Sequence, residues 1–204
     1  VLSLGNDPTG APNATIGTGS SRDSVGLPVN AVFSRPYKYA DANGDGIITP
    51  DEVTVDPNYT YAGYSAPRDI FSITNGFDLF NRQLRITVLQ DYKGGNILNN
   101  SSGQFYSQNF SSWYTNNLKT TPLWDQARAV ANSSAKNPTP SDYGFRENGQ
   151  FWKLREVSAA LTLPNSLAGR IRARDAQLVF SARNLHTWTS YTGVDPEENY
   201  STGD

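Results

Sequence analysis

Apolar and polar residues alternate in four stretches of the chain, at 68–80, 83–92, 150–163 and 175–185. Alternation with a period of two predicts β-strands, because successive side chains of a strand point to opposite faces of a sheet. A tight turn at 80–82 joins the first two stretches. Residues 164–170, which resemble a short helical cap, join the last two. The pattern therefore predicts two antiparallel hairpins.

Each predicted hairpin has one apolar face and one polar face. We expect a common apolar face, turned toward lipid or a packed partner, made by Leu84, Ile86, Val88, Leu161, Leu178 and Phe180. The alternation changes phase within 151–156, and a β-bulge near Glu156 would account for the change. Such strands occur in outer-membrane barrels and in half-buried soluble sheets alike. The alternation alone does not decide between the two classes.

The segments outside these strands contain little regular patterning. Residues 1–25 are rich in Gly, Ser, Thr and Asn, which predicts a loop or a disordered arm. Residues 93–148 form a long insertion of the kind that is usually functional or disordered. One short helix is predicted within it at 122–131, with Thr121 as N-cap and Pro122 at the first helical position.

The lengths of the links between the predicted strands also bear on the fold. Short, long and short links in succession are typical of an outer-membrane barrel, whose periplasmic turns are short and whose extracellular loops are long. This order places 80–82 and 164–170 on the periplasmic side. It places 93–148, and the segments around Asp41 and Asp204, outside. The expected fold is all-β: antiparallel hairpins from a transmembrane β-barrel, with long loops and one short helix.

Composition excludes several classes of function. The chain has 204 residues and a formal net charge of -2, which gives no case for a nucleic-acid partner. Cys is absent and His186 is the single histidine, so thiolate sites and multi-histidine metal centres are excluded. Asp195, Glu197 and Glu198 read as a polar loop rather than an acid/base pair, and no phosphate-binding loop or nucleophile elbow is present. We therefore expect no catalytic residues and no enzyme.

One stretch, 41–52, matches the calcium-loop pattern D-x-[DN]-x-[DN]-G-x5-E throughout. Ca2+ prefers six to eight oxygen ligands, and the expected donors are Asp41, Asn43, Asp45, the Ile47 carbonyl and Glu52. An EF-hand needs a helix on each side of its loop. Here Pro28, Pro36 and Pro57 argue against helical flanks. We predict one Ca2+ in a structural clip on extended arms, rather than a calmodulin-type switch.

Four aromatic residues are candidates for ligand binding: Tyr106, Trp113, Tyr114 and Trp152. Flat aromatic rings can stack on the apolar CH faces of sugars. The competing role, which we favour, is an aromatic girdle at the membrane interface or packing within the loops.

Four motifs spread along 26–199, at 37–46, 91–96, 155–164 and 182–197, resemble those of the SusC/RagA-type TonB-linked outer-membrane transporters. The segment 37–46 is similar to their D-x-N-G-D-G motif and 91–96 to a strand end. Residues 155–164 resemble their R-E-L-S and Y-T-L-P strand, and 182–197 their G-R-N-L-x-T-W-T-x-Y-x-G-x-D-P-E stretch. The agreement in order and spacing is stronger evidence than the strand pattern.

The resemblance implies a barrel of about 22 strands in the bacterial outer membrane, with a plug and a TonB box. It also implies import of oligosaccharides or peptides with a SusD-like surface lipoprotein as partner. This chain resembles only the C-terminal strands, without the plug or the region that meets TonB. It starts at Val1 and contains no Met, which suggests a fragment.

Two alternatives to the transporter remain open at this point. A structural piece with unpaired strand edges would assemble edge to edge into a polymer or filament. A soluble calcium-stabilised β-module would bind glycans. Because about four strands cannot close a barrel, we expect that the isolated segment is not self-sufficient as a monomer.

Overall fold

The computed structural model describes residues 1–9, 11, 14–114, 119–133 and 140–197, with the backbone alone for 108–114. The chain divides into two compact units. We call one the packed region; it comprises Val1–Pro67, Gly95–Gly149 and the segment from Tyr191 onward. The other, the strand region, comprises Arg68–Gly94 and Gln150–Ser190. In the described parts, no helix combines the length and apolarity needed to cross a membrane.

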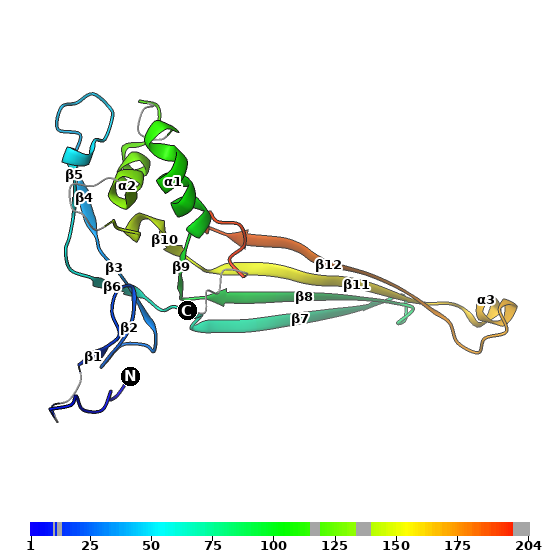
Figure 1. Cartoon of the computed structure of the whole chain (residues 1–204). Helices are drawn as coiled ribbons and strands as arrows, with labels where there is room; N and C mark the ends of the chain where they lie inside the picture. Colours follow the sequence, from blue (N-terminus) through cyan, green and yellow to red (C-terminus); the bar gives the residue numbers. More distant parts are fainter. Residues whose placement is uncertain (10, 12–13, 115–118, 134–139, 198–204) are drawn as a thin grey trace. The chain divides into compact units, whose positions relative to one another are not determined.

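The strand region is one antiparallel sheet of four long strands in the order β12-β11-β8-β7 (Figure 1). The first hairpin pairs β7 (Asp69–Leu79) with β8 (Leu84–Gly94), and the second pairs β11 (Phe151–Thr162) with β12 (Gln177–Thr189). Both predicted hairpins are therefore confirmed. They join edge to edge through β8 and β11, and a short helix, α3 (Asn165–Arg170), lies in the link between β11 and β12.

The register confirms the predicted common face. Leu161 pairs with both Leu84 and Leu178. In the next row on the same face, Ile86 and Phe180 lie on either side of Ala159. The opposite face is polar and carries ion pairs, among them Arg155 Nε to Asp91 Oδ2 at 2.6 Å and Arg183 Nε to Glu156 Oε2 at 3.1 Å. The sheet is thus apolar on one face and charged on the other.

A β-bulge in β11 keeps these faces consistent. The pairing of β11 with both neighbours shifts between Leu154 and Glu156, as the phase change predicted. Without the extra residue, Trp152 and Leu154 would fall on the polar face, because side chains alternate along a strand. The bulge places them on the same face as Val157 and Leu161.

The packed region contains short strands. One sheet has the order β1-β2-β3-β6, formed by β1 (Thr15–Ile16), β2 (Ser21–Ser24), β3 (Ala31–Ser34) and β6 (Thr60–Gly63). The expectation of a loop or disordered arm over 1–25 is therefore wrong in part, because β1 and β2 lie within it and β2 pairs with β3. Two ribbons complete the strands: β4 (Tyr37–Tyr39) with β5 (Val53–Val55), and β9 (Ile97–Asn99) with β10 (Arg146–Asn148).

Two helices lie in the long insertion. The predicted one is present as α2 (Leu123–Ser133), and a second, α1 (Ser101–Tyr114), was not expected. Its Ser- and Asn-rich sequence has low helix propensity. The side chain of Asn100 supports its start, since Asn100 Oδ1 accepts a hydrogen bond from the Gly103 backbone N–H at 2.8 Å, as an N-cap does. Two 3-10 turns, η1 (Pro50–Glu52) and η2 (Tyr143–Phe145), precede β5 and β10.

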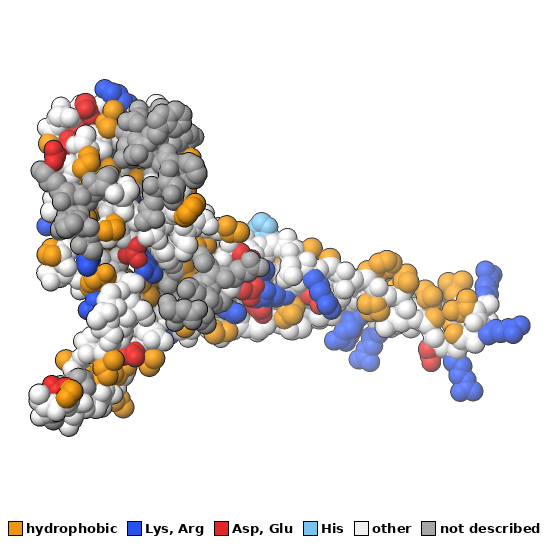
Figure 2. Space-filling model, viewed as in Figure 1, with side chains coloured by type: hydrophobic (Ala, Val, Ile, Leu, Met, Phe, Trp, Pro, Cys, Tyr) orange, Lys and Arg blue, Asp and Glu red, His pale blue; other side chains and the backbone are white. Residues whose placement is uncertain are grey.

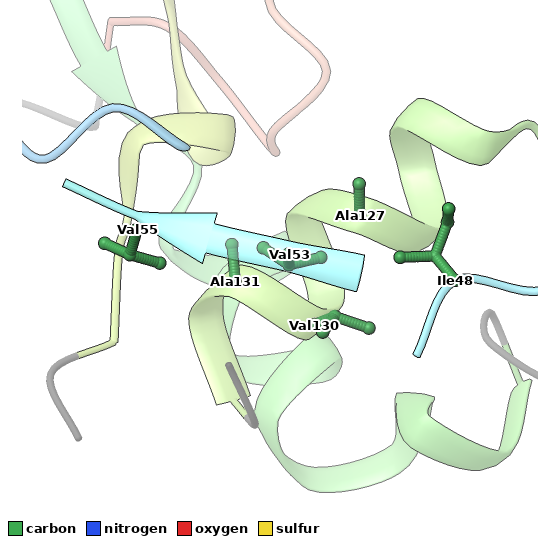
Figure 3. Packing of buried hydrophobic residues seen from close by; sticks show 6 residues of the cluster. All are labelled: Ile48, Val53, Val55, Ala127, Val130 and Ala131. Atoms are coloured by element: carbon green, nitrogen blue, oxygen red, sulfur yellow. The ribbon is translucent and has the colours of Figure 1, made fainter. Parts of the chain in front are cut away.

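The hydrophobic core of the packed region joins the end of the 41–52 loop to α2. Its fully buried members are Ile48, Val53, Val55, Ala127, Val130 and Ala131 (Figure 3). Tyr37 packs against this cluster, and burial raises the pKa of its hydroxyl to about 12. Helix α2 therefore packs against the end of the loop and against β5, so the position of the loop depends on the position of the helix.

Candidate functional site

The 41–52 loop connects the two strands of the β4–β5 ribbon. Tyr39 pairs with Val53, and the Ala40 backbone N–H donates to the Glu52 carbonyl at 3.1 Å, which closes the loop at its base. The arms are strands apart from the single turn of η1. The prediction of a loop on non-helical arms is confirmed.

Inside the loop, oxygen atoms of Asp41, Asn43 and Asp45 converge on backbone amides. Asp41 accepts hydrogen bonds from the N–H groups of Gly44 at 2.8 Å, Asp45 at 3.2 Å and Gly46 at 2.9 Å. Gly44 and Gly46 have φ of +71° and +81°, a backbone conformation that L side chains rarely adopt. The two glycines thus allow the tight fold that brings three side-chain oxygens inward.

Glu52 closes the loop from the opposite end. Its Oε1 accepts from the Ala42 N–H at 2.8 Å, and its Oε2 accepts from both the backbone N–H and the hydroxyl of Thr49 at 2.9 and 3.0 Å. The Thr49 backbone N–H stabilises the charged carboxylate and, with the other donors, lowers the pKa of Glu52 below its usual value. The carboxylate at position twelve is therefore held ionised and over the loop.

The donor set fits a hard cation in type, because it is made of carboxylate, amide and carbonyl oxygens in the order that a calcium loop uses. Over the described ranges, however, no three His, Cys, Asp or Glu side chains are grouped closely enough to hold a metal ion. The carboxylates of Asp41 and Glu52 face backbone N–H groups instead. Ca2+ binding would require these carboxylates to turn from the amides toward the ion.

Gln126 in α2 holds the loop to the rest of the packed region, and the sequence analysis did not identify it. Its fully buried amide accepts from the Ile48 N–H at 2.8 Å. It donates to the carbonyls of Gly46 and Thr121 at 3.0 and 2.9 Å. A glutamine beside Ala127, Val130 and Ala131 on the predicted helix was the available signal, because a buried amide needs hydrogen-bond partners.

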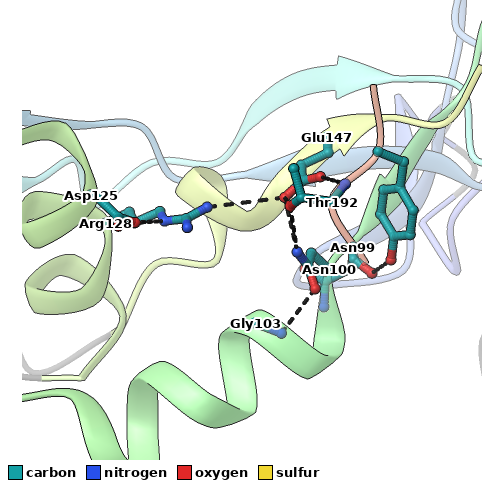
Figure 4. A network of polar contacts seen from close by, with 8 residues as sticks. Asn99, Asn100, Gly103, Asp125, Arg128, Glu147 and Thr192 are labelled. Atoms are coloured by element: carbon teal, nitrogen blue, oxygen red, sulfur yellow. Dashed lines mark hydrogen bonds and ion pairs between the residues drawn. The ribbon is translucent and has the colours of Figure 1, made fainter. Parts of the chain in front are cut away.

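A second polar network fastens the segment after β12 onto the long insertion (Figure 4). Both carboxylate oxygens of Glu147 accept from Thr192, one from its backbone N–H and one from its hydroxyl, each at 2.7 Å. Buried Asn100 donates to Glu147 Oε1 at 3.0 Å and to the Thr192 hydroxyl at 2.9 Å. The network therefore joins the start of α1, β10 and the segment after β12.

The Y-x-G motif beside this network is explained by packing. The Tyr191 hydroxyl donates to the Asn99 carbonyl at 3.1 Å, and the ring folds over Gly193. A Cβ on residue 193 would lie 2.3 Å from that ring. The glycine is needed for close approach.

Trp152 lies in a row of aromatic rings across the strand region. The register aligns one ring from each strand: Phe71 with Tyr92, Tyr92 with Trp152, and Trp152 with Trp188. Ring centroids of Phe71 and Tyr92 are 4.7 Å apart, and those of Tyr92 and Trp152 are 5.1 Å apart. This row lies on the apolar face, at the strand ends that lead to the long insertion, where an interfacial girdle is expected.

The other aromatic candidates lie outside the strand region. Tyr106 lies in α1 of the packed region and is exposed. Trp113 and Tyr114 lie at the end of the same helix, and their side chains fall outside the described residues. Ligand binding by these four residues remains a prediction.

Sequence comparisons identify two relatives, each matched over part of this chain. No family model matches the sequence. A TonB-dependent receptor of Formosa agariphila is 27% identical over 169 residues, which is 78% of this chain and 16% of that receptor. A second TonB-dependent receptor of the same organism is 38% identical over 53 residues, which is 26% of this chain and 5% of that receptor. The chain therefore spans a small part of these receptors.

Solved structures show the same fold. A structure of the RagAB peptide transporter aligns with 87% of this chain at a TM-score of 0.59 and 20% identity. The aligned part is 21% of the RagAB chain. The closed-closed state of the RagAB peptide importer aligns with 91% of this chain at a TM-score of 0.60 and 19% identity, and the aligned part is 22% of the importer chain. These relatives are receptors and transporters rather than enzymes. Motifs, strand register and both comparisons confirm the resemblance: the chain is similar in sequence to part of TonB-dependent receptors, and it has the fold of a β-barrel segment of the RagAB transporter.

Proposed function

We propose that this chain forms lipid-spanning strands of a TonB-dependent importer in the bacterial outer membrane. The observation that carries the proposal is the apolar face of the four-stranded sheet. Phe77 and Phe180 on this face are exposed, although such side chains favour burial. Lipid covers a face of this kind in a barrel, and the aromatic row marks where it meets water. The filament and the soluble glycan-binding module are not favoured by the comparisons.

The importer carries oligosaccharides or peptides through a barrel completed by further strands and a plug. A peptide is named for RagAB, the transporter with which the chain shares its fold. The partners that we propose are a SusD-like surface lipoprotein at the long loops and TonB at a plug-side segment. Within this chain, the polar face with Asp91, Arg155 and Glu156 lines the lumen and the long insertion faces the cell exterior.

A cysteine scan of β8 in outer membranes tests the proposal, because the chain contains no native Cys. We expect Ile86→Cys and Val88→Cys, in the full transporter chain, to resist a water-soluble maleimide and to react with a lipid-soluble one. The matched control Thr87→Cys, on the opposite face, should show the reverse preference. Equal labelling at all three positions by the water-soluble reagent would reject a lipid-facing sheet.

We further propose that the 41–52 loop binds one Ca2+ through Asp41, Asn43, Asp45, the Ile47 carbonyl and Glu52. The unbroken spacing, the two glycines with positive φ and the ionised Glu52 support this assignment. The ion would replace backbone N–H groups as the partner of the carboxylates and neutralise their mutual repulsion. Its role is structural, since the loop borders the core that Ile48 and Val53 share with α2.

Thermal unfolding with Ca2+ or with a chelator tests this assignment. Ca2+ at 100 times its Kd would stabilise the packed region by about 2.7 kcal/mol. Asp41→Asn should remove most of the shift. Asp56→Asn is the matched control, because Asp56 accepts a comparable local hydrogen bond from the Asn58 N–H at 2.8 Å and lies outside the loop. A wild-type midpoint that does not respond to Ca2+ would exclude the site.

A further inference from the structure

Arginine side chains gather at the short-link end of the strand region. Arg82 lies in the turn between β7 and β8. Arg170 ends α3, and Arg172 and Arg174 follow it in the link to β12. All four are exposed, and Figure 2 shows Lys and Arg side chains collected around α3 at this end of the sheet.

This positive charge is not balanced locally. Within the described residues, none of the four guanidinium groups makes an ion pair. Asp78, near the turn, is within 3.4 Å of Arg85 instead. The link 163–176 has three arginines and one acidic residue, Asp175. The end of the sheet therefore presents a net positive surface with donors free to bind an anion.

Large apolar side chains accompany the arginines. Phe80 is 73% exposed in the turn, Ile171 is 68% exposed after α3, and Leu167 is exposed within it. Apolar bodies combined with cationic heads suit the boundary between hydrocarbon and polar headgroups. An acidic soluble partner would match the charge but would leave these three apolar groups to be covered separately.

The apolar face of the sheet runs directly into this basic end. Its last row consists of Leu79, Leu84, Leu161 and Leu178. Immediately beyond that row come the turn with Arg82 and the link with Arg170. In a membrane, the next chemical layer after hydrocarbon is the phosphate layer, and guanidinium groups bind phosphate through paired hydrogen bonds.

We propose that Arg82, Arg170, Arg172 and Arg174 form a binding surface for anionic phospholipid headgroups of the periplasmic leaflet. The inference rests on the proposed function, which puts the short links on the periplasmic side. The arginines bind the lipid phosphates while Phe80, Leu167 and Ile171 insert among the acyl chains. The surface fixes the depth of the sheet at this leaflet, opposite the aromatic row at the other end.

Reconstitution of the full transporter chain into nanodiscs tests the proposal. Nanodiscs of phosphatidylcholine are compared with nanodiscs that also contain phosphatidylglycerol, and the readouts are the thermal midpoint and the phosphatidylglycerol retained after extraction. Wild type should be more stable with phosphatidylglycerol. The triple variant Arg170→Gln, Arg172→Gln, Arg174→Gln should lose that difference, with retained lipid falling about five-fold per arginine.

Two further variants isolate the cause. Replacing the same three residues by lysine keeps the charge and should keep most of the phosphatidylglycerol preference. Lys38→Gln, Arg68→Gln and Lys119→Gln together remove three exposed charges elsewhere and should leave it intact. The inference is overturned if the first glutamine variant keeps the wild-type preference, or if the control loses it equally. Binding of polyglutamate by the three arginines without any lipid effect would also overturn it, in favour of an acidic protein partner.

The cysteine scan separates this outcome from failure of the proposed function. If Ile86→Cys is lipid-shielded and the arginine variant has no effect, only the headgroup surface is wrong. If Ile86→Cys reacts as a water-exposed residue in the same nanodiscs, the membrane-spanning sheet itself is wrong.

Discussion

Two valines show how differently the two regions use apolar residues. Val130 in α2 of the packed region is fully buried, whereas Val179 in β12 of the strand region is 59% exposed. Among the described residues, the buried hydrophobic side chains belong to the packed region except for Phe151 and Ala168. The packed region encloses its apolar groups by its own folding. The strand region displays them, so its stability depends on what surrounds it.

The largest effect is expected from placing a charge in the enclosed core. Val130→Asp buries a carboxylate among Val53 and Ala127 without a partner and should destabilise the packed region by more than about 4 kcal/mol. Val179→Asp is the control, on the exposed polar face of β12, and should cost less than about 1 kcal/mol. Hydrogen exchange at β5 and α2 amides measures the difference. Similar costs at both valines would contradict the contrast.

A charge on the apolar face of the strand region should have the next largest effect. Val88→Lys puts an ammonium group near the middle of β8 on the apolar face, at a cost of about 2–4 kcal/mol in a bilayer. Thr87→Lys, one residue away, lies on the opposite, polar face and should cost close to nothing. Unfolding by denaturant in lipid vesicles gives both values. A greater cost at Thr87 would mean that the faces are assigned in reverse.

The link between the loop and α2 should contribute less. Gln126→Leu fills a similar volume but leaves the Ile48 N–H and the Gly46 carbonyl without their buried partner. The expected loss is about 1–3 kcal/mol in the packed region. Gln177→Leu, at an exposed position of β12, should change stability by less than about 0.5 kcal/mol. Equal effects on thermal unfolding would show that the buried amide has no special role.

The smallest effect is expected from protonating Glu52. Because its folded-state pKa is lowered from 4.5, its contribution to stability is complete above that pH and declines as the pH falls through the lower, folded-state pKa. In chelator, the amide signals of Ala42 and Thr49 should shift together below pH 4.5 in a selectively labelled chain. Glu52→Gln should abolish the transition. A transition that persists in Glu52→Gln would assign it to another group.

The strand region was predictable because its information is local. Alternation sets which face each side chain occupies, so Leu84, Leu161 and Phe180 could be assigned to one face before any pairing was known. The break in that alternation predicted a bulge near Glu156, and the register shifts between Leu154 and Glu156. The calcium-loop spacing and the neighbouring prolines likewise predicted a loop on extended arms.

The packed region was less predictable because tertiary contacts determine it. Helix α1 has a sequence that does not favour a helix, and it forms where Asn100 is held by Glu147 and Thr192. Strand β2 is recognisable only through its pairing with β3. Gln126 is important because α2 packs against Ile48, whose backbone N–H donates to the Gln126 side chain. Periodicity within a short window contains none of these contacts.

The β9–β10 ribbon has a consequence for how the sheet assembles. Strands β8 and β11 are neighbours, although residues 95–150 separate them in sequence. Closing so long a loop costs roughly 2 kcal/mol more entropy than closing the turn between β7 and β8. Ile97 pairs with Asn148, and the Gly149 N–H donates to the Asn96 carbonyl at 3.0 Å, so the excursion is tied at its base. Once this ribbon forms, β8 and β11 are joined by an effectively short connection and can pair as the strands of a short hairpin do. The sequence between β9 and β10 can then diverge through evolution while the pairing of β8 with β11 stays the same.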